Sequence, residues 1–270
     1  TGDGNANDTA AVHRMLAAAA ASEKPATLLF TENSVVYAAN ADNRYLFYLK
    51  ALRDVTIDGR GTTFLLHPDI RFMSMQDCTN IVVRNLNINF RPLPFADALV
   101  IADSENEGWI DAQLLHSAST EQFKGAPTKT DGEQAFFAML WNQGPYDLIS
   151  CHYWTRLIEV LPEPGCLRIH CEKNFKQHSF IEPNTPRVSI PLPGVAHRYG
   201  PGGCVDIFDN HNVKLHNIEL WSAPWFGFRV FRNSGHLHFN KVNIRPEPNS
   251  GNLTSTWRDG FHVKGNRAEL

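Results

Sequence analysis

The stretches Cys204-Val-Asp-Ile-Phe-Asp-Asn-His-Asn-Val213 and Phe228-Arg-Val-Phe-Arg-Asn-Ser-Gly-His-Leu237 can be laid over one another residue by residue. Each starts with a short apolar strand, passes through a polar turn centred on Asn, and reaches an apolar residue nine positions after its first residue. Residues 72–81 and 261–270 repeat the pattern, with Cys or Asn in the turn. Four copies of one unit indicate a repeat architecture.

A second strand follows the repeat in its three complete copies, over residues 81–88, 213–220 and 237–244. Within residues 213–220 apolar side chains alternate with polar ones, apart from a slip at Asn217, which is expected where a strand bends. Three successive copies start 24 and 33 residues apart. This spacing favours an all-β parallel solenoid with loops of variable size, whose coils bury their apolar faces by stacking. A propeller is disfavoured, because its blades are hairpin-linked and regularly spaced.

The N-terminal segment predicts a short helix that caps the solenoid. Asp8 or Thr9 can accept hydrogen bonds from free backbone N–H groups, and the Ala-rich run that follows has high helix propensity. Four apolar residues then fall on one helical face, which gives the helix a surface to cover. These residues are Val12, Met15, Leu16 and Ala19.

The repeat disappears between Ile88 and Cys204, where other strand-like runs surround a polar loop at residues 117–133. We therefore predict an inserted antiparallel β-domain over residues 93–200. It separates the cap and first coils (residues 1–92) from the continuing coils (residues 201–270).

The last residue, Leu270, aligns with the start of a second strand, so the chain is expected to stop inside a coil and leave an open edge. We expect either a truncated chain, with a C-terminal segment missing, or a second chain that completes the helix.

Composition excludes several classes of protein. The 270-residue chain has a net charge of -3 and a pI near 6.4, so no basic field is available for nucleic acid. The longest apolar stretch, at residues 16–21, is too short to span a membrane. Five scattered cysteines without a CxxC pair indicate buried free thiols rather than a zinc ribbon or a disulfide framework. We expect no cofactor and no metal ligands, and the sequence leaves a structural calcium and the oligomeric state open.

Three segments carry a resemblance to known proteins. The start Gly2-Asp-Gly-x-x-Asn-Asp-Thr-Ala-Ala11 looks like the N-terminal cap of pectin-lyase-type β-helix proteins. Residues 87–95 resemble the entry to the barrel insertion of glycoside hydrolase family 110, the α-1,3-galactosidases. Residues 253–262 are similar to that family's strand with a Ser-Thr-Thr-Ala-Asp-Ala-x-His pattern. The resemblance spans nearly the whole chain, and the order of cap, coils, insertion and Asp-containing strand is its most specific part.

The resemblance implies a right-handed parallel β-helix and an inverting hydrolase that acts on galactose-containing glycans. A secreted or periplasmic location goes with such a substrate, and Thr1 is expected to follow a removed leader or an artificial boundary. The chain departs from the family at Trp257-Arg258 and at Gly260, where the family has small residues and Ala. Substrate choice therefore stays open. The family also carries a further acidic pair one coil later, where this chain stops.

Asp259 is the predicted catalytic carboxylate. Glycoside hydrolysis uses one carboxylic acid that protonates the leaving oxygen and one carboxylate that activates water or attacks. Asp259 precedes an apolar strand segment, where a solenoid presents side chains on an open face. The alternative is a turn Asp that hydrogen-bonds its own loop. Its catalytic partner is expected beyond the end of the chain.

A polar and aromatic patch is predicted around Asp259. Arg229 and His262 hold one position in successive aligned repeats, so both point outward, one above the other. With Arg232, Arg258 and Trp257 they would bind substrate, because sugars offer hydroxyls to cationic donors and an apolar face to an indole. Three arginines would also suit an anionic sugar. The alternative is a ladder of surface residues that only stabilises the sheet.

Trp225 is a further candidate for substrate binding. It lies with two other aromatic residues on the loop at residues 221–227, which either forms a platform for a sugar ring or plugs the solenoid. Two other functions remain open for the whole chain. One is a polysaccharide lyase on the same fold, and the other is a non-catalytic glycan-binding β-solenoid, because fold alone does not separate these functions.

Overall fold

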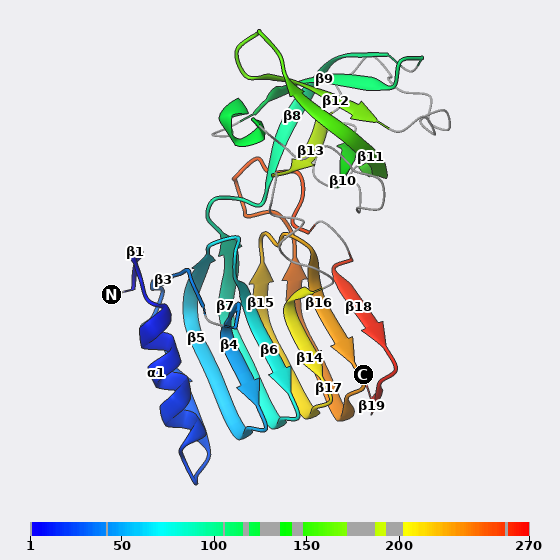
Figure 1. Cartoon of the computed structure of the whole chain (residues 1–270). Coiled ribbons are helices and arrows are strands. Elements are labelled where there is room, and N and C mark those ends of the chain that lie inside the picture. Colours follow the sequence, from blue (N-terminus) through cyan, green and yellow to red (C-terminus); the bar gives the residue numbers. More distant parts are fainter. Residues whose placement is uncertain are drawn as a thin grey trace. The chain divides into compact units, whose positions relative to one another are not determined.

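The computed structural model describes residues 2–41, 43–104, 106–115, 119–124, 136–141, 148–171, 187–192, 202–256 and 259–269. Its structure is mostly β, with the α-helix α1 (Thr9–Ala20) near the N-terminus and the short 3-10 helix η1 (Thr120–Phe123) (Figure 1). The chain divides into two compact units. The first comprises residues 1–93, 201–248 and 255–270, and the second comprises residues 94–200 and 249–254.

The first unit consists of two parallel sheets between which the chain alternates (Figure 1). Sheet A has the strand order β1 (Asp3–Asn7), β3 (Val35–Ala38), β5 (Arg53–Leu66), β7 (Thr79–Phe90), β15 (His211–Leu220), β17 (Ser234–Ile244) and β19 (Arg267–Glu269), and β2 (Ala26–Leu29) also pairs with β5. Sheet B has the order β18 (Phe261–Lys264), β16 (Phe226–Phe231), β14 (Gly203–Phe208), β6 (Arg71–Gln76) and β4 (Tyr45–Lys50). Each pass through both sheets is called a coil below.

The strand register confirms most of the repeat alignment and corrects one part of it. In sheet A, Val213 pairs with Ile81 and with Leu237, as the alignment predicts. In sheet B, however, Phe228 pairs with Val205 and not with the predicted Cys204. The extra residue of that copy lies at the start of β17 (Ser234–Ile244), where the register shifts between Ser234 and Leu237 and Gly235 has a φ of 70°. Glycine readily adopts a positive φ, so the first residues of β17 absorb the insertion, and the pairing with β15 keeps one register from Leu237 to Ile244.

Apolar side chains from both sheets form one core inside the coils. Phe72 and Phe228 are both fully buried, but they do not hold the equivalent positions that the repeat alignment predicts, because Val205 pairs with Met73 on one side and with Phe228 on the other. Phe261 was expected in a related interior position, and its ring does stack on that of Phe228 with centroids 4.8 Å apart. It is nevertheless 39% exposed, because β18 is the edge strand of sheet B in the described part of the chain.

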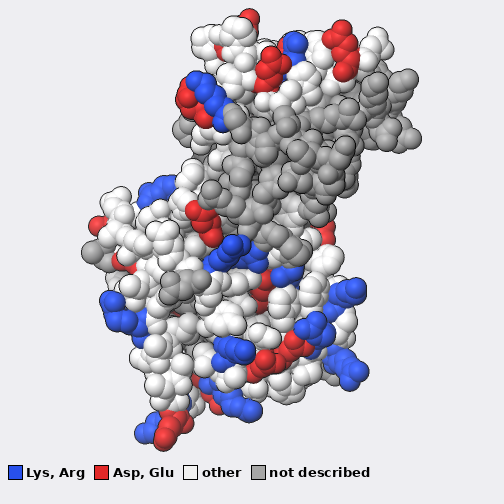
Figure 2. Space-filling model, in the orientation of Figure 1, with Lys and Arg blue, Asp and Glu red and all other residues white. Residues whose placement is uncertain are grey.

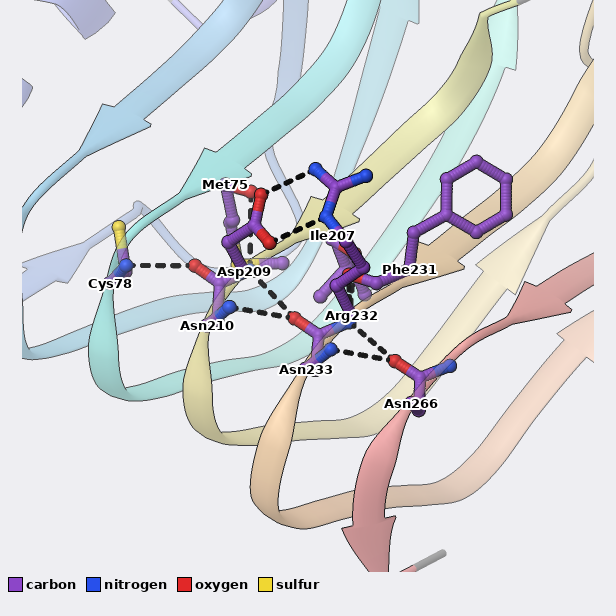
Figure 3. A network of polar contacts seen from close by, with 9 residues as sticks. All are labelled: Met75, Cys78, Ile207, Asp209, Asn210, Phe231, Arg232, Asn233 and Asn266. Carbon is purple, nitrogen blue, oxygen red and sulfur yellow. Dashed lines mark hydrogen bonds and ion pairs between the residues drawn. The ribbon is translucent and has the colours of Figure 1, made fainter.

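A ladder of three asparagines, of which Asn210 and Asn233 are buried, fixes the turns between sheets B and A (Figure 3). Asn210 donates from Nδ2 to Oδ1 of Asn233 at 3.1 Å, and Asn233 donates to Oδ1 of Asn266 at 3.0 Å. At the other end, the Cys78 N–H donates to Oδ1 of Asn210 at 2.9 Å. An amide suits this place because it donates to one neighbour while it accepts from the other. The residue before each of these four has a positive φ: Asp77, Asp209, Arg232 and Gly265.

The slip predicted at Asn217 is a bend within β15. Asn217 has a φ of 53°, and its Nδ2 donates to Oδ1 of Asn85 in the neighbouring coil at 3.1 Å. Asn85 and Lys241 have the same left-handed backbone in β7 and β17. The three strands therefore bend at one level. Asn adopts this conformation at lower cost than most residues, which explains its use here.

The predicted helix forms as α1, and Val12 and Leu16 are buried while Met15 and Ala19 pack against the same core. The expected cap is only partly correct. Asp8 is the N-cap residue, but its side chain makes no capping hydrogen bond. Instead, Oδ1 of Asn7 accepts from the Thr9 N–H at 3.1 Å, so the preceding residue supplies this acceptor.

The second unit contains a closed antiparallel barrel with its own apolar core. Its strand order is β10 (Phe136–Trp141), β11 (Leu148–Val160), β12 (Cys166–Cys171), β9 (Trp109–Leu114), β8 (Phe95–Ser104) and β13 (Arg187–Pro191). Leu167, Ile169 and Val188 are completely buried in this core. Alternation along antiparallel strands places such residues inside and the intervening polar residues outside.

Three cysteines, Cys78, Cys166 and Cys204, are buried and free, as predicted, and the side chains of the other two lie outside the described residues. Burial raises the pKa of the Cys204 thiol to about 12. In the part of the chain that the structure describes, no helix has the length and apolar character of a membrane span. The same residues hold no group of three or more His, Cys, Asp or Glu side chains suited to a metal ion.

Candidate functional site

The outer face of sheet B carries one row of polar side chains across neighbouring strands. The register pairs Asp206 of β14 with Arg229 of β16, and Arg229 with His262 of β18. On the other side, Asp206 pairs with Ser74 of β6. Parallel strands place paired residues about 4.8 Å apart, so these side chains stand next to one another. The predicted equivalence of Arg229 and His262 is confirmed.

A buried carboxylate lies at the centre of this row. Asp206 is 1% exposed, and it accepts from Nε and Nη2 of Arg229 at 2.8 and 2.7 Å. It also accepts from the Tyr45 hydroxyl at 2.7 Å and from the Gly203 N–H at 2.9 Å. Arg71 donates to the Tyr45 hydroxyl at 2.9 Å, and its Nη1 lies 3.7 Å from Oδ2 of Asp206. A buried charge is tolerable only with such partners.

Tyr45 stays protonated in this environment. Burial, and then the negative charge of Asp206, raise the pKa of Tyr45 to about 12. Two glycines before Asp206 make the close packing possible. A Cβ on Gly202 would lie 1.6 Å from Nη1 of Arg71, and a Cβ on Gly203 would lie 2.7 Å from Oδ1 of Asp206.

Arg229 is held from two sides. Asp206 engages its Nε and Nη2, while its Cζ lies 5.0 Å from the ring centroid of Phe208 and 5.8 Å from that of Phe231. These two rings stack on each other with centroids 5.2 Å apart. The guanidinium is therefore fixed in position, and Nη1 is the nitrogen not engaged by Asp206.

Arg232 does not join Asp259, contrary to the prediction. It follows the end of β16, whereas Asp259 lies at the level of Phe226, the first residue of that strand. Six residues of strand separate the two levels by roughly 20 Å. Arg232 instead forms a bidentate pair with Asp209, at 2.7 and 2.6 Å, and its hydrogen bonds lower the pKa of that carboxyl.

The predicted cationic patch is thus largely neutralised, because Arg229 and Arg232 are each paired with an aspartate. The two arginines therefore give little support to the binding of an anionic sugar at these positions. Figure 2 likewise shows acidic and basic side chains interspersed among the coloured atoms of this view, rather than one basic field. Trp257 and Arg258, the other residues predicted around Asp259, lie outside the described residues.

The backbone of Asp259 is anchored to β16. Its carbonyl accepts from the Gly227 N–H at 3.1 Å, and the carbonyl of Gly260 accepts from the Phe228 N–H at 2.8 Å. A Cβ on Gly227 would lie 2.6 Å from the Gly260 oxygen, so a side chain there would displace this segment. The Asp259 side chain is 56% exposed, and the structure presents it to solvent from a fixed backbone.

His262 contacts the Asp259 carboxylate directly. Its Nδ1 lies 2.7 Å from Oδ2 of Asp259. The imidazole is flanked by two half-buried phenyl rings of β16, with centroids 5.0 Å away for Phe226 and 5.5 Å away for Phe231. An exposed carboxylate beside an imidazole can accept a proton from water or from a hydroxyl group and can hold it near a bound ligand.

Trp225 is buried, with 9% of its surface exposed, and its ring meets that of Phe226 edge-on at 6.2 Å. An open indole face is therefore not available to a sugar at this position. The aromatic rings that lie beside His262 are those of Phe226 and Phe231. The structure brings together Arg229 and His262 along one row and Asp259 with His262, whereas Trp225 is buried against Phe226.

Sequence reasoning missed Asp206, although a signal for it was present. Asp206 lies four residues before Asn210, as Arg229 and His262 lie four residues before Asn233 and Asn266. Alignment on the turn asparagines would have placed Asp206 in the same row. Alignment on the first apolar residue instead placed Asp206 one position away, at the level of Val230, so its place in the row was not recognised. The residues Tyr45 and Arg71 carry no comparable sequence signal.

Fold and site together define a protein of parallel strands with a polar and aromatic outer face. No family model matches the chain. It is similar to two proteins of Bacteroides thetaiotaomicron: α-1,3-galactosidase B, with 22% identity over 234 residues, and α-1,3-galactosidase A, with 24% identity over 232 residues. These matches cover 80% and 83% of this chain, but only 35% and 38% of the relatives. The chain thus spans little more than a third of the length of these curated relatives.

Proposed function

We propose that this chain carries part of the active site of a glycoside hydrolase that cleaves galactose-containing glycans. The observation that carries the proposal is the exposed Asp259 carboxylate, anchored to β16 and contacted by His262. It occurs in a chain that is similar over four fifths of its length to two α-1,3-galactosidases. The substrate would be a carbohydrate met outside the cytoplasm, by a secreted or periplasmic protein.

We further propose that the two parallel sheets form a right-handed parallel β-helix of the pectin-lyase type. Alternation of the chain between sheets A and B and the asparagine ladder both support it. In this proposal residues 93–200 are an inserted domain, as the sequence predicts. The loss of the repeat there and the separate barrel core support this assignment.

An inverting mechanism would need a second carboxyl group about 6.5–9.5 Å from Asp259. Two other carboxylates of β14 and its turn do not suit the role. Asp206 is buried and satisfied by its donors, and Asp209 lies at the far end of the sheet, paired with Arg232. We therefore propose that the partner carboxylate comes from outside the described residues.

Substrate contacts would follow from the same row. Nη1 of Arg229 can donate to a sugar hydroxyl, Nε2 of His262 can accept a hydrogen bond from one, and the Phe226 ring offers an apolar surface. Trp257 and Arg258 precede Asp259 in the sequence and remain proposed substrate contacts. Arg232 would meet only a substrate long enough to run along the strand, since it lies roughly 20 Å from the level of Asp259.

A non-catalytic glycan-binding solenoid is the second candidate. It is favoured by one observation: no second exposed carboxylate stands beside Asp259 among the described residues of sheet B. Binding of a galactoside without any turnover would select it.

Hydrolysis of a galactose-α-1,3-galactose disaccharide, followed by proton NMR, tests the proposal. An inverting enzyme releases β-galactose first, whereas a retaining enzyme releases α-galactose. Release of β-galactose that stops in Asp259→Asn supports the proposal. Product that appears at the same rate in both chains contradicts it, as does a complete lack of product together with a lack of galactoside binding.

A further inference from the structure

We infer that His262 is a positioning residue: its Nδ1 fixes Oδ2 of Asp259 and so orients the other carboxylate oxygen toward the reacting bond. This inference rests on the proposed function, because it assigns the role of a residue in the same site. The contact between Nδ1 and Oδ2 is 2.7 Å, within the range of a charge-assisted hydrogen bond. Among the described side chains, His262 is the one bonded to the Asp259 carboxylate.

The imidazole is held independently of Asp259. His262 belongs to β18 and pairs with Arg229 in the parallel register. The rings of Phe226 and Phe231, both from β16, lie on either side of it along the strand, at interplanar angles of 47° and 77°. These contacts restrict rotation of the ring. The backbone of Asp259, by contrast, is anchored through Gly227, but its side chain is 56% exposed. His262 therefore orients Asp259 rather than the reverse.

The chemistry of the pair fixes the form of the imidazole. An ionised carboxylate only accepts hydrogen bonds, so the hydrogen must be on Nδ1. In the neutral imidazole Nε2 then carries the lone pair, and it is the ring nitrogen that could still meet a ligand. The two ring nitrogens of His262 therefore have different roles: Nδ1 donates to Asp259, and Nε2 makes no contact with that carboxylate.

Two substitutions separate these roles. In His262→Asn the side-chain amide nitrogen can occupy the place of Nδ1, whereas in His262→Gln it reaches the place of Nε2. A positioning role predicts that His262→Gln lowers kcat by about 10²-fold, the effect of misplacing a reacting group by about 1 Å. His262→Asn should restore most of this loss, and KM should change little in either variant.

The kinetic test uses the whole chain and p-nitrophenyl α-galactoside. Greater loss of kcat in His262→Gln than in His262→Asn supports the inference. The inference is overturned if His262→Gln keeps the wild-type kcat, or if both variants change only KM, as a direct substrate contact would. Equal loss of kcat in both variants also overturns it. Circular dichroism and the melting temperature establish that each variant is folded.

A second readout does not depend on activity. Long-range proton–nitrogen NMR spectra of the histidine rings report which nitrogen carries the hydrogen, and the signal absent from His262→Asn identifies His262. We expect hydrogen on Nδ1 in the wild-type chain and a shift toward the Nε2 form in Asp259→Ala. Hydrogen on Nε2 in the wild type, or identical spectra in Asp259→Ala, overturns the inference. If the wild-type chain hydrolyses no galactoside, the proposed function fails, while this spectrum still decides the role of His262.

Discussion

Asp206 and Arg229 form a bidentate ion pair, at 2.8 and 2.7 Å, between neighbouring strands, although the carboxylate is 1% exposed and the arginine side chain 15%. Desolvation makes such a pair expensive to form and more expensive to break. The effect of this ion pair is therefore mainly to position a side chain: it holds Arg229 beside His262 on the outer face of sheet B.

Asp206→Ala should lower the free energy of unfolding by about 3 kcal/mol, because it leaves two arginines and a phenol without their buried partner. Urea denaturation measures the change. Asp209→Ala is the matched control, since Asp209 and Arg232 have the same bidentate geometry but side chains that are 31% and 64% exposed. That variant should lose at most about 1 kcal/mol. Similar losses in both would mean that Asp206 is not effectively buried.

Asn233→Ala should break the ladder in its middle. It removes the acceptor for both the backbone N–H and Nδ2 of Asn210, and the donor to the Ile207 carbonyl, all in a buried position. Each unsatisfied buried group costs about 1–3 kcal/mol, so the unfolding free energy should fall by at least about 2 kcal/mol. The control is Asn243→Ala, an exposed asparagine of β17 that bonds Glu219. A change below about 0.5 kcal/mol at both positions would show that the ladder adds no stability.

Tyr45→Phe should reduce the sensitivity of the fold to alkali. Because the folded-state pKa of Tyr45 is raised from 10.0 to about 12, its contribution to stability is complete below pH 10 and is lost as the pH rises from 10 to about 12. Unfolding free energies at about pH 9 and about pH 11 should therefore differ less in the variant than in the wild type. Tyr48→Phe, on the same strand but 36% exposed, serves as control. The raised pKa is refuted if both variants behave like the wild type.

Asp259→Asn should abolish turnover of an aryl α-galactoside, with a loss of about 10²–10⁴-fold or more and little change in KM. The reason is that an amide neither donates nor accepts the proton that the reaction requires. Asp209→Asn, at the other end of the sheet, should keep its turnover. Near-normal turnover in Asp259→Asn would identify Asp259 as a turn residue.

Gly227→Ala should misplace Asp259 without removing it. Its Cβ would stand 2.6 Å from the Gly260 oxygen, so the backbone beside Asp259 must move. A shift of about 1 Å can lower kcat by about 10²-fold. Lys264→Ala, an exposed position of β18, provides the comparison and should leave kcat near the wild-type value. Equal activity of Gly227→Ala and wild type would show that this anchor does not position the carboxylate.

The stacked coils could be predicted from the amino-acid pattern. Apolar alternation, turn asparagines and a common offset predict parallel strands, and the pairing of Val213 with Ile81 and Leu237 confirms them. The prediction succeeds because each coil must bury the same face against its neighbours, so every copy of the repeat has the same apolar pattern. The helix at Thr9–Ala20 was predictable for the same reason, since its apolar face is local to the sequence.

The arrangement of the site could not be predicted in this way, because it depends on contacts between coils. Repeat counting cannot tell where along a copy an extra residue lies, and only hydrogen-bond pairing across coils places it at the start of β17, near Gly235, and sets Asp206 beside Arg229. Arg232 is only three residues from Arg229 in sequence, yet a strand extends by about 3.3 Å per residue, so Arg232 lies at the opposite end of the strand from the level of Asp259. Contacts between coils, such as that of His262 with Phe226, join residues 36 positions apart. The sequence of each strand shows which of its side chains face the core and which face outward. Which residues of the next coil these side chains contact is fixed only when the coils stack.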